Sequence, residues 1–155
     1  MNVLIIYATY SGGTLLAAEA IQETLKKQSI DSQVKNVRDL TEEDVKNHSH
    51  FIFGSCTWFE NKLEGQLHGG YADLIERIPT FTIGNKQCAV YGLGDNNMYA
   101  IHFCEAADHL KKFVEDHNGV VVTEPLKIDR FYFEQEENTK KLKDWAEQLP
   151  TLFTE

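Results

Sequence analysis

The chain is short of the residues that mark several common kinds of protein. It has 3 cysteines in 155 residues, Cys56, Cys88 and Cys104, and they form no CxxC pair. An odd number of cysteines is a poor basis for a disulfide framework, so we expect free thiols in a reducing compartment. The 6 histidines form no HExxH motif and keep no metal-site spacing with the cysteines. No metal site is therefore predicted.

Long apolar runs and an excess of positive charge are also missing. No hydrophobic stretch approaches the ~18 residues that span a bilayer, and the N-terminus begins directly with a strand-like segment. We therefore expect neither a membrane span nor a signal peptide, and we expect the protein to be cytoplasmic. The 24 acidic and 15 basic residues give a formal net charge of -9. This charge argues against nucleic acid and anionic membranes as partners and favours a basic protein.

The composition, 42% hydrophobic and 25% charged, is that of a globular protein, and we expect residues 1–155 to form one domain and a monomer. Strand-like apolar runs and helical apolar periodicities alternate along the chain. The runs are 3–8, 33–37, 50–54, 87–92 and 120–125, and the helical segments are 15–25, 67–78, 103–114 and 142–149, with Trp145 in the core. Residues 130–138 remain a loop of unclear role.

Strands separated by helices favour right-handed crossovers and a parallel sheet covered on both faces. The predicted fold is an α/β, three-layer, doubly wound five-stranded parallel sheet with strand order 2-1-3-4-5. Such sheets bind ligands outside the carboxyl ends of the strands, where the strand order reverses. The loops after strands one, three and four are therefore expected to converge on one site.

The loop after the first strand has the composition of a phosphate-binding turn. It comprises Thr9, Tyr10, Ser11, Gly12, Gly13 and Thr14. Its hydroxyls, its glycine amides and the N-terminus of the next helix would supply hydrogen-bond donors to an anion. Residues 1–25 contain no Lys or Arg, so dipoles and hydroxyls would have to neutralise the charge. The alternative is an ordinary turn in which Ser or Thr caps the helix.

The other two loops each carry an aromatic residue. The second comprises Ser55, Cys56, Thr57, Trp58, Phe59 and Glu60, and the third comprises Gly92, Leu93, Gly94, Asp95 and Tyr99 and leads into Phe103 and Cys104. Two aromatic rings beside a phosphate cradle suit a planar heteroaromatic ligand with a phosphate tail. The alternative is that Trp58 and Tyr99 only cap the hydrophobic core.

In these loops the chain resembles the flavodoxins. Thr9, Ser11, Gly12 and Thr14 match that family's first loop, with Ser11 in place of a common Thr. Gly54, Thr57 and Trp58 match its second loop, and Gly92, Gly94, Asp95 and Tyr99 match its third. Residues 120–128 run without the long insertion that some members carry in the last strand, so the chain resembles a short-chain flavodoxin.

The resemblance implies a non-covalently bound flavin mononucleotide (FMN), with Trp58 over its inner face and Tyr99 over its outer face. It also implies a low-potential one-electron carrier that shuttles between semiquinone and hydroquinone. Such a carrier passes electrons from a reductase to acceptor redox proteins and has no catalytic residue of its own. One departure from the family follows Trp58. The family often has Gly, Asn or Asp there, at a peptide bond that flips when the flavin is reduced, whereas this chain has Phe59-Glu60.

Two other functions use the same fold. An FMN-dependent quinone or nitro reductase would take hydride from a nicotinamide cofactor, but such enzymes carry additional segments that this chain lacks. A receiver module needs an acidic pair at the end of its first strand, whereas this chain has Tyr7, Ala8 and Thr9 there. The electron carrier is therefore the favoured interpretation.

Overall fold

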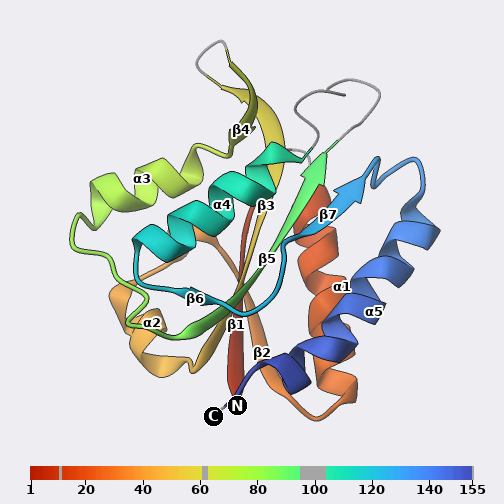
Figure 1. The fold of residues 1–155 in the computed structure, drawn as a ribbon, viewed down its shortest axis with the longest axis horizontal. Coiled ribbons are helices and arrows are strands. Elements are labelled where there is room, and N and C mark those ends of the chain that lie inside the picture. The colour runs from red at the N-terminus through yellow and green to blue at the C-terminus, as the bar shows by residue number, and fades with distance from the viewer. Residues whose placement is uncertain (11, 61–62, 95–103, 155) are drawn as a thin grey trace.

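The computed structural model describes residues 1–10, 12–60, 63–94 and 104–154, and for residues 58–60 and 63–66 it describes the backbone alone. A twisted sheet lies between two layers of helices (Figure 1). The strands are β1 (Asn2–Ala8), β2 (Asp31–Asn36), β3 (His50–Glu60), β4 (Leu63–Leu67), β5 (Gln87–Gly94), β6 (Val120–Val121) and β7 (Leu126–Asp129). The helices are α1 (Gly13–Lys27), the 3-10 helix η1 (Val37–Asp39), α2 (Glu42–Asn47), α3 (Gly70–Arg77), α4 (Glu105–Asp116) and α5 (Gln135–Leu152).

The order of the parallel strands is β2-β1-β3-β5, followed by β6 and β7, which both pair with β5. This confirms the predicted order 2-1-3-4-5, with β5 in fourth place and β6 and β7 sharing the fifth. The predicted single run over 120–125 is wrong in its extent, because the last strand divides around Pro125. Proline has no amide hydrogen to donate to a neighbouring strand, which favours a break there.

Each face of the sheet has its own hydrophobic core. On one face, α1 and α5 pack over β1, β3 and β5 through Ala17, Ile21, Leu25, Leu142, Ala146 and Leu149. On the other face, α2, α3 and α4 contribute Val45, Tyr71, Leu74, Leu110 and Val114. All these residues are buried. Because both faces are covered, the strands read as nearly continuous apolar runs rather than as alternating patterns.

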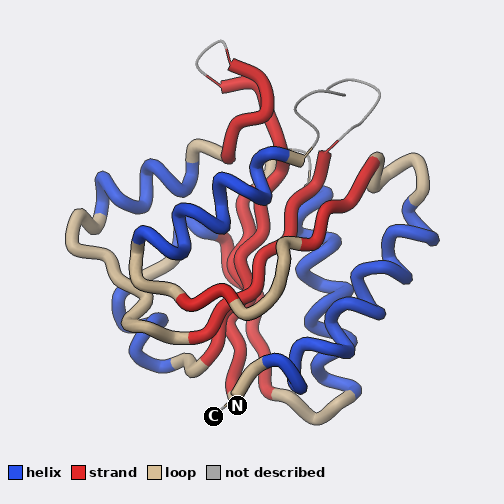
Figure 2. The backbone as a smooth tube through the Cα atoms, viewed as in Figure 1, coloured by secondary structure: helices blue, strands red, loops and turns tan. Residues whose placement is uncertain are grey.

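Strand β3 is longer than the predicted strand over 50–54. It continues to Glu60 and pairs with β4 in an antiparallel hairpin, with an irregularity between Trp58 and Glu60. The segment that was expected to be the second loop is therefore an extended strand that rises past the edge of the sheet (Figure 2). Leu67, expected at the start of a helix, belongs to β4, and α3 begins at Gly70.

The last helix also differs from its predicted extent. Helix α5 begins at Gln135, inside the segment that was expected to be a loop. The side chain of Asn138 is buried and donates a hydrogen bond to the carbonyl of Asp129, 2.7 Å away. This bond fixes the first turn of α5 to the end of β7.

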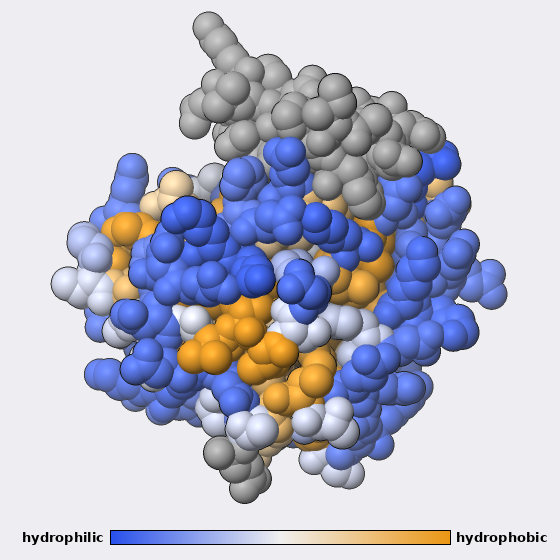
Figure 3. Space-filling model, in the orientation of Figure 1, coloured by the Kyte–Doolittle hydropathy of each residue, from blue (hydrophilic) through white to orange (hydrophobic). Residues whose placement is uncertain are grey.

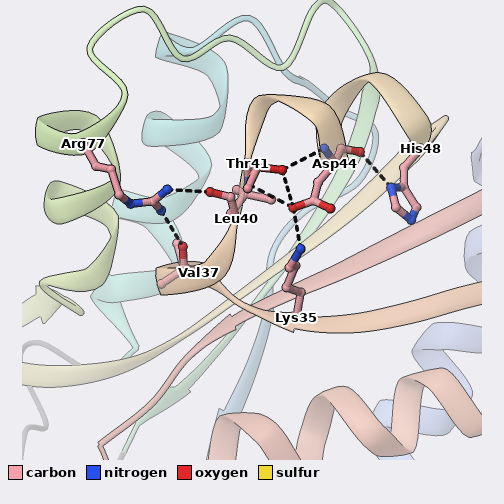
Figure 4. A network of polar contacts seen from close by, with 7 residues as sticks. All are labelled: Lys35, Val37, Leu40, Thr41, Asp44, His48 and Arg77. Carbon is pink, nitrogen blue, oxygen red and sulfur yellow. Dashed lines mark hydrogen bonds and ion pairs between the residues drawn. The ribbon is translucent and has the colours of Figure 1, made fainter.

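A polar network joins β2, α2 and α3 (Figure 4). Thr41 and Asp44 form a reciprocal capping box at the start of α2, and Asp44 lies 2.7 Å from the Nζ of Lys35. Arg77 of α3 donates to the carbonyls of Leu40 and Val37. Burial acts to raise the pKa of Asp44, but its hydrogen bonds with Lys35 and Thr41 outweigh burial and lower it.

The surface over α4 and α5 is hydrophilic, and an apolar strip lies between these helices at the edge of the sheet (Figure 3). Val120, which is 47% exposed, belongs to this edge. Among the helices that the structure describes, none combines the length and the apolar composition needed to cross a bilayer.

Candidate cofactor site

At one edge of the sheet, β1 ends beside the points in β3 and β5 where the second and third sequence motifs begin. Ala8 of β1 is in register with Ser55 of β3, and Ser55 is in register with Gly92 of β5. The next pair along, Cys56 and Leu93, is also in register. The three sequence motifs therefore begin side by side, at the sheet edge where an open parallel sheet binds ligands.

The 9–14 loop is shaped around an internal hydrogen bond. The amide of Gly12 donates to the hydroxyl of Thr9 at 2.9 Å. Gly12 has a φ of 90°, a left-handed conformation that glycine adopts without steric cost. Helix α1 then begins at Gly13 and has no acidic residue in its first turn, and no side chain among the described residues caps it. Its N-terminal amides and dipole therefore remain available to an anion.

Thr14 is the most informative side chain of this loop. It is fully buried, and its hydroxyl has no hydrogen-bond partner among the described residues. An unsatisfied buried hydroxyl costs about 1–3 kcal/mol, so such a group calls for an explanation. A ligand with acceptor oxygens would supply one. The residues present in the 9–14 loop thus fit a phosphate group.

Two buried tyrosines hold the strands beneath the loop. The hydroxyl of Tyr91 donates to the carbonyl of Thr14 at 2.9 Å, and the hydroxyl of Tyr71 donates to the carbonyl of Gly54 at 2.8 Å. Burial, as the largest cause, raises the pKa of both phenols, so they remain protonated donors. The ring of Tyr91 occupies the space where a side chain at Gly54 would lie.

The second motif lies on β3. Ser55 is fully buried, and its hydroxyl donates to the carbonyl of Cys56 and accepts from the amide of His68. Thr57 is also buried, and Cys56 is half-buried. Trp58, Phe59 and Glu60 continue the strand in extended conformation. Their side chains lie outside the description, so the placement of Trp58 over a flavin stays a prediction.

The third motif is described up to Gly94. Gly92 and Leu93 are buried in β5, and a Cβ on Gly94 would lie 2.9 Å from the backbone nitrogen of Cys104. Gly94 therefore allows the start of α4 to approach the strand. Asp95, Tyr99 and Phe103 lie outside the described residues, as does Ser11 of the first loop. The expected stacking of Tyr99 stays a prediction.

Cys104 occupies a structural position at the start of α4. It has a φ of 52°, and its buried thiol donates to the carbonyl of Gly92 at 3.3 Å. Burial raises the pKa of this thiol to about 12. Cys104 therefore contacts the backbone beneath the site, and its raised pKa keeps the thiol protonated and unreactive as a nucleophile.

The structure brings to the site three residues that the sequence motifs did not include, His68, Arg130 and Tyr132. Tyr10 stacks on His68, with ring centroids 4.0 Å apart. Tyr132 packs against the glycines of the 9–14 loop. The backbone amide of Arg130 donates to the carbonyl of Gly94, and its guanidinium lies over the ring of Phe133, 5.0 Å from the centroid. The sequence signal for Tyr132 was the aromatic run Phe131-Tyr132-Phe133 within the unassigned segment 130–138.

Among the described residues at this edge, the side chains form no metal-binding arrangement. Within residues 1–10, 12–60, 63–94 and 104–154, no three His, Cys, Asp or Glu side chains are arranged to hold a metal ion. Besides His68 and Arg130, the described groups at the site are mainly hydroxyls, backbone amides and aromatic rings, which suit binding of a planar ring system and an anion.

Comparisons with known proteins agree with this geometry. The family model described as Flavodoxin matches residues 5–145. The flavodoxin of Maridesulfovibrio salexigens is 32% identical over 127 residues, which cover 81% of this chain and 84% of that protein. Probable flavodoxin 2 of Bacillus subtilis is 30% identical over 129 residues, which cover 83% and 82%.

Solved structures show the same architecture. Oxidised Flavodoxin 2 from Bacillus cereus superposes with a TM-score of 0.83 at 27% identity, over 99% of this chain and 100% of that one. The Fusobacterium nucleatum flavodoxin bound to flavin mononucleotide has a TM-score of 0.79 at 21% identity, covering 99% of each chain. Together with the family match over most of the sequence, these similarities show that the chain belongs to the flavodoxin family.

Proposed function

We propose that this chain is a single-domain, monomeric, cytoplasmic electron carrier that binds FMN without a covalent bond and transfers one electron at a time. Membership of the flavodoxin family makes it an electron-transfer protein rather than an enzyme with its own substrate. The structural relative from Fusobacterium nucleatum was solved with flavin mononucleotide, and the same cofactor fits the residues described here.

One observation carries the cofactor assignment. At the start of α1, the buried hydroxyl of Thr14 has no partner among the described residues, and the helix has no capping side chain. The hydroxyls of Thr9 and Thr14 and the amides of Gly13 and Thr14 would therefore hold the phosphate. Gly12 would supply the left-handed turn that places them, since its own amide donates to Thr9. Ser11 and Tyr10 are proposed to complete this loop.

The remaining predicted residues are proposed to surround the ring system. Trp58 and Tyr99 would cover its two faces, and backbone groups of 58–60 would contact its edge. The other proposed contacts come from Ser55, Cys56, Thr57, Gly92, Leu93, Gly94, Asp95 and Phe103. When bound, the flavin supplies the redox chemistry, while the protein binds it and sets its electrostatic surroundings.

The acidic composition of the chain supports a low reduction potential. A carboxylate at about 10 Å, with an effective dielectric constant of ~20, disfavours an added negative charge by roughly 1.7 kcal/mol. For one electron this corresponds to a decrease of roughly 70 mV, before screening by salt. The net charge of -9 favours this direction, and Arg130 is a described cation that opposes it.

The proposed partners are basic redox proteins, a reductase and acceptor enzymes. The start of α5 and its N-cap residue present the exposed carboxylates of Glu134, Glu136 and Glu137, which follow Tyr132 in the sequence. These charges would steer a basic partner toward the edge where the cofactor is proposed to lie.

A reductive titration of the FMN-loaded protein tests the electron-transfer proposal. Two separate one-electron steps, the second at the lower potential, would support it, whereas uptake of both electrons in one step would contradict it. Steady-state oxidation of NADPH by the isolated protein would instead indicate a flavin-dependent reductase.

A further inference from the structure

The turn that follows β7 is held firmly against the site. The amide of Arg130 donates to the carbonyl of Gly94 at 2.9 Å, and Arg130 has a φ of 51°, which turns the chain away from the sheet. The amides of Phe133 and Glu134 then both donate to the carbonyl of Arg130. Residues 130–134 therefore form a turn with a defined shape, anchored to the end of β5.

This turn fixes the ring of Tyr132. Phe131, only 5% exposed, lies in the core shared by α1 and α5. Its ring meets that of Tyr132 edge to face, with centroids 5.7 Å apart and planes at 77°. This geometry is favourable for aromatic pairs. The buried neighbour thus orients a ring that is itself 49% exposed.

The oriented ring lies beside Gly12 and Gly13. A Cβ placed on Gly13 would lie 3.3 Å from the Cε2 of Tyr132, and a Cβ placed on Gly12 would lie 3.6 Å from its hydroxyl oxygen. The two glycines therefore provide the room in which the phenol lies. Its hydroxyl reaches the side of the loop where the backbone turns into α1.

The chemistry of the loop calls for another neutral donor. Residues 1–25 contain no Lys or Arg, so a phosphate in this loop depends on amides and hydroxyls. A phenol is a hydrogen-bond donor without charge. From its position and chemistry, we infer that Tyr132 is a fourth element of the cofactor site: its hydroxyl donates to the phosphate, and its ring closes the loop over it.

The inference rests on the proposed FMN function and is tested by comparing FMN with riboflavin, which has no phosphate. Binding of both is measured by flavin fluorescence for the wild type, Tyr132→Phe and Tyr132→Ala. Phe133→Ala is the matched control, since Phe133 belongs to the same turn and is 75% exposed. Inorganic phosphate is included as a competitor, to compare a free anion with the phosphate of FMN.

We expect Tyr132→Phe to weaken FMN binding by about tenfold to a hundredfold, the range of one hydrogen bond to a charged group. Tyr132→Ala should in addition release FMN faster in stopped-flow dissociation. Riboflavin binding should change much less, and inorganic phosphate should compete less well in both variants. Phe133→Ala should bind both flavins as the wild type does.

Wild-type affinity for FMN in both Tyr132 variants would overturn the inference, and so would equal losses for FMN and riboflavin. Both results leave FMN binding by the wild type intact and so leave the proposed function standing. Failure of the wild type to bind FMN would instead refute the proposed function together with this inference. Thermal unfolding of each apoprotein separates a loss of fold from a loss of contact.

Discussion

Replacement of Gly54 by alanine should disturb the site through the strand beneath it. Gly54 and Tyr91 are register partners on β3 and β5. A Cβ on Gly54 would lie 2.0 Å from the Cζ of Tyr91 and 2.4 Å from its hydroxyl oxygen. Side-chain atoms cannot approach so closely, and the ring of Tyr91 is fully buried. The ring must therefore move, and its hydrogen bond to the carbonyl of Thr14 must break.

The cost follows from these two changes. Overpacking of a core costs roughly 1–3 kcal/mol and a lost hydrogen bond roughly 0.5–1.5 kcal/mol, so Gly54→Ala should destabilise the fold by about 2–4 kcal/mol. The free energy of unfolding is measured by urea denaturation of the apoprotein. FMN affinity should fall as well, because Tyr91 supports the loop that contains Thr14.

The control is a double-mutant cycle with Tyr91→Leu. Leucine lacks the Cε1, Cζ and hydroxyl atoms that the new methyl group would meet, so the penalty of Gly54→Ala should fall below ~1 kcal/mol in the Tyr91→Leu background. A destabilisation of less than ~0.5 kcal/mol by Gly54→Ala alone would refute the reasoning, because surface substitutions cost as little. An equal penalty in both backgrounds would also refute it.

Three further results are expected. Thr14→Val should leave the apoprotein as stable as the wild type or stabilise it by up to ~1 kcal/mol, because it removes an unsatisfied buried hydroxyl. FMN binding should weaken. A marked loss of apoprotein stability in urea denaturation would contradict this. Asp44→Asn should destabilise the fold by ~1 kcal/mol at pH 6. The difference in unfolding free energy between Asp44→Asn and the wild type should shrink below about pH 4. The folded-state pKa of Asp44 is lowered, so its stabilising contribution is lost as the carboxylate is protonated. A constant difference in unfolding free energy from pH 6 to pH 3 would argue against this. Electron transfer to a basic partner should slow as the salt concentration rises above ~0.1 M. This slowing should be smaller when Glu134, Glu136 and Glu137 are changed to Gln. Stopped-flow rates that do not change with salt would remove the docking argument.

The sheet and its order could be predicted because each buried strand is an apolar run and each covering helix has its own periodicity. The position of the site followed from the same topology, since the loops after β1, β3 and β5 had to share one edge. The helix α5 was predicted too short because its apolar periodicity begins only at Leu142, after a polar first half. The hairpin of β3 and β4 was missed because the predicted strand ended at Gly54.

The contacts of Tyr132 and Tyr91 could not be predicted from the sequence, and the reason differs from that for α5 and the hairpin. The position of Tyr132 depends on the register of Gly94 with Asp129 and on the left-handed turn at Arg130. The fit of Tyr91 against Gly54 likewise depends on which residues of β3 and β5 are paired. Local sequence patterns carry no information on such pairings, because they arise only when distant segments pack together.

The central claim is that the carboxyl edge of the sheet holds FMN through uncharged donors. Its most direct test is titration of the purified apoprotein with FMN, followed by flavin fluorescence and the visible absorption spectrum. We expect fluorescence to be quenched until one FMN is bound per chain, and a yellow complex that survives dialysis. Unquenched fluorescence, with all FMN lost on dialysis, would contradict the claim.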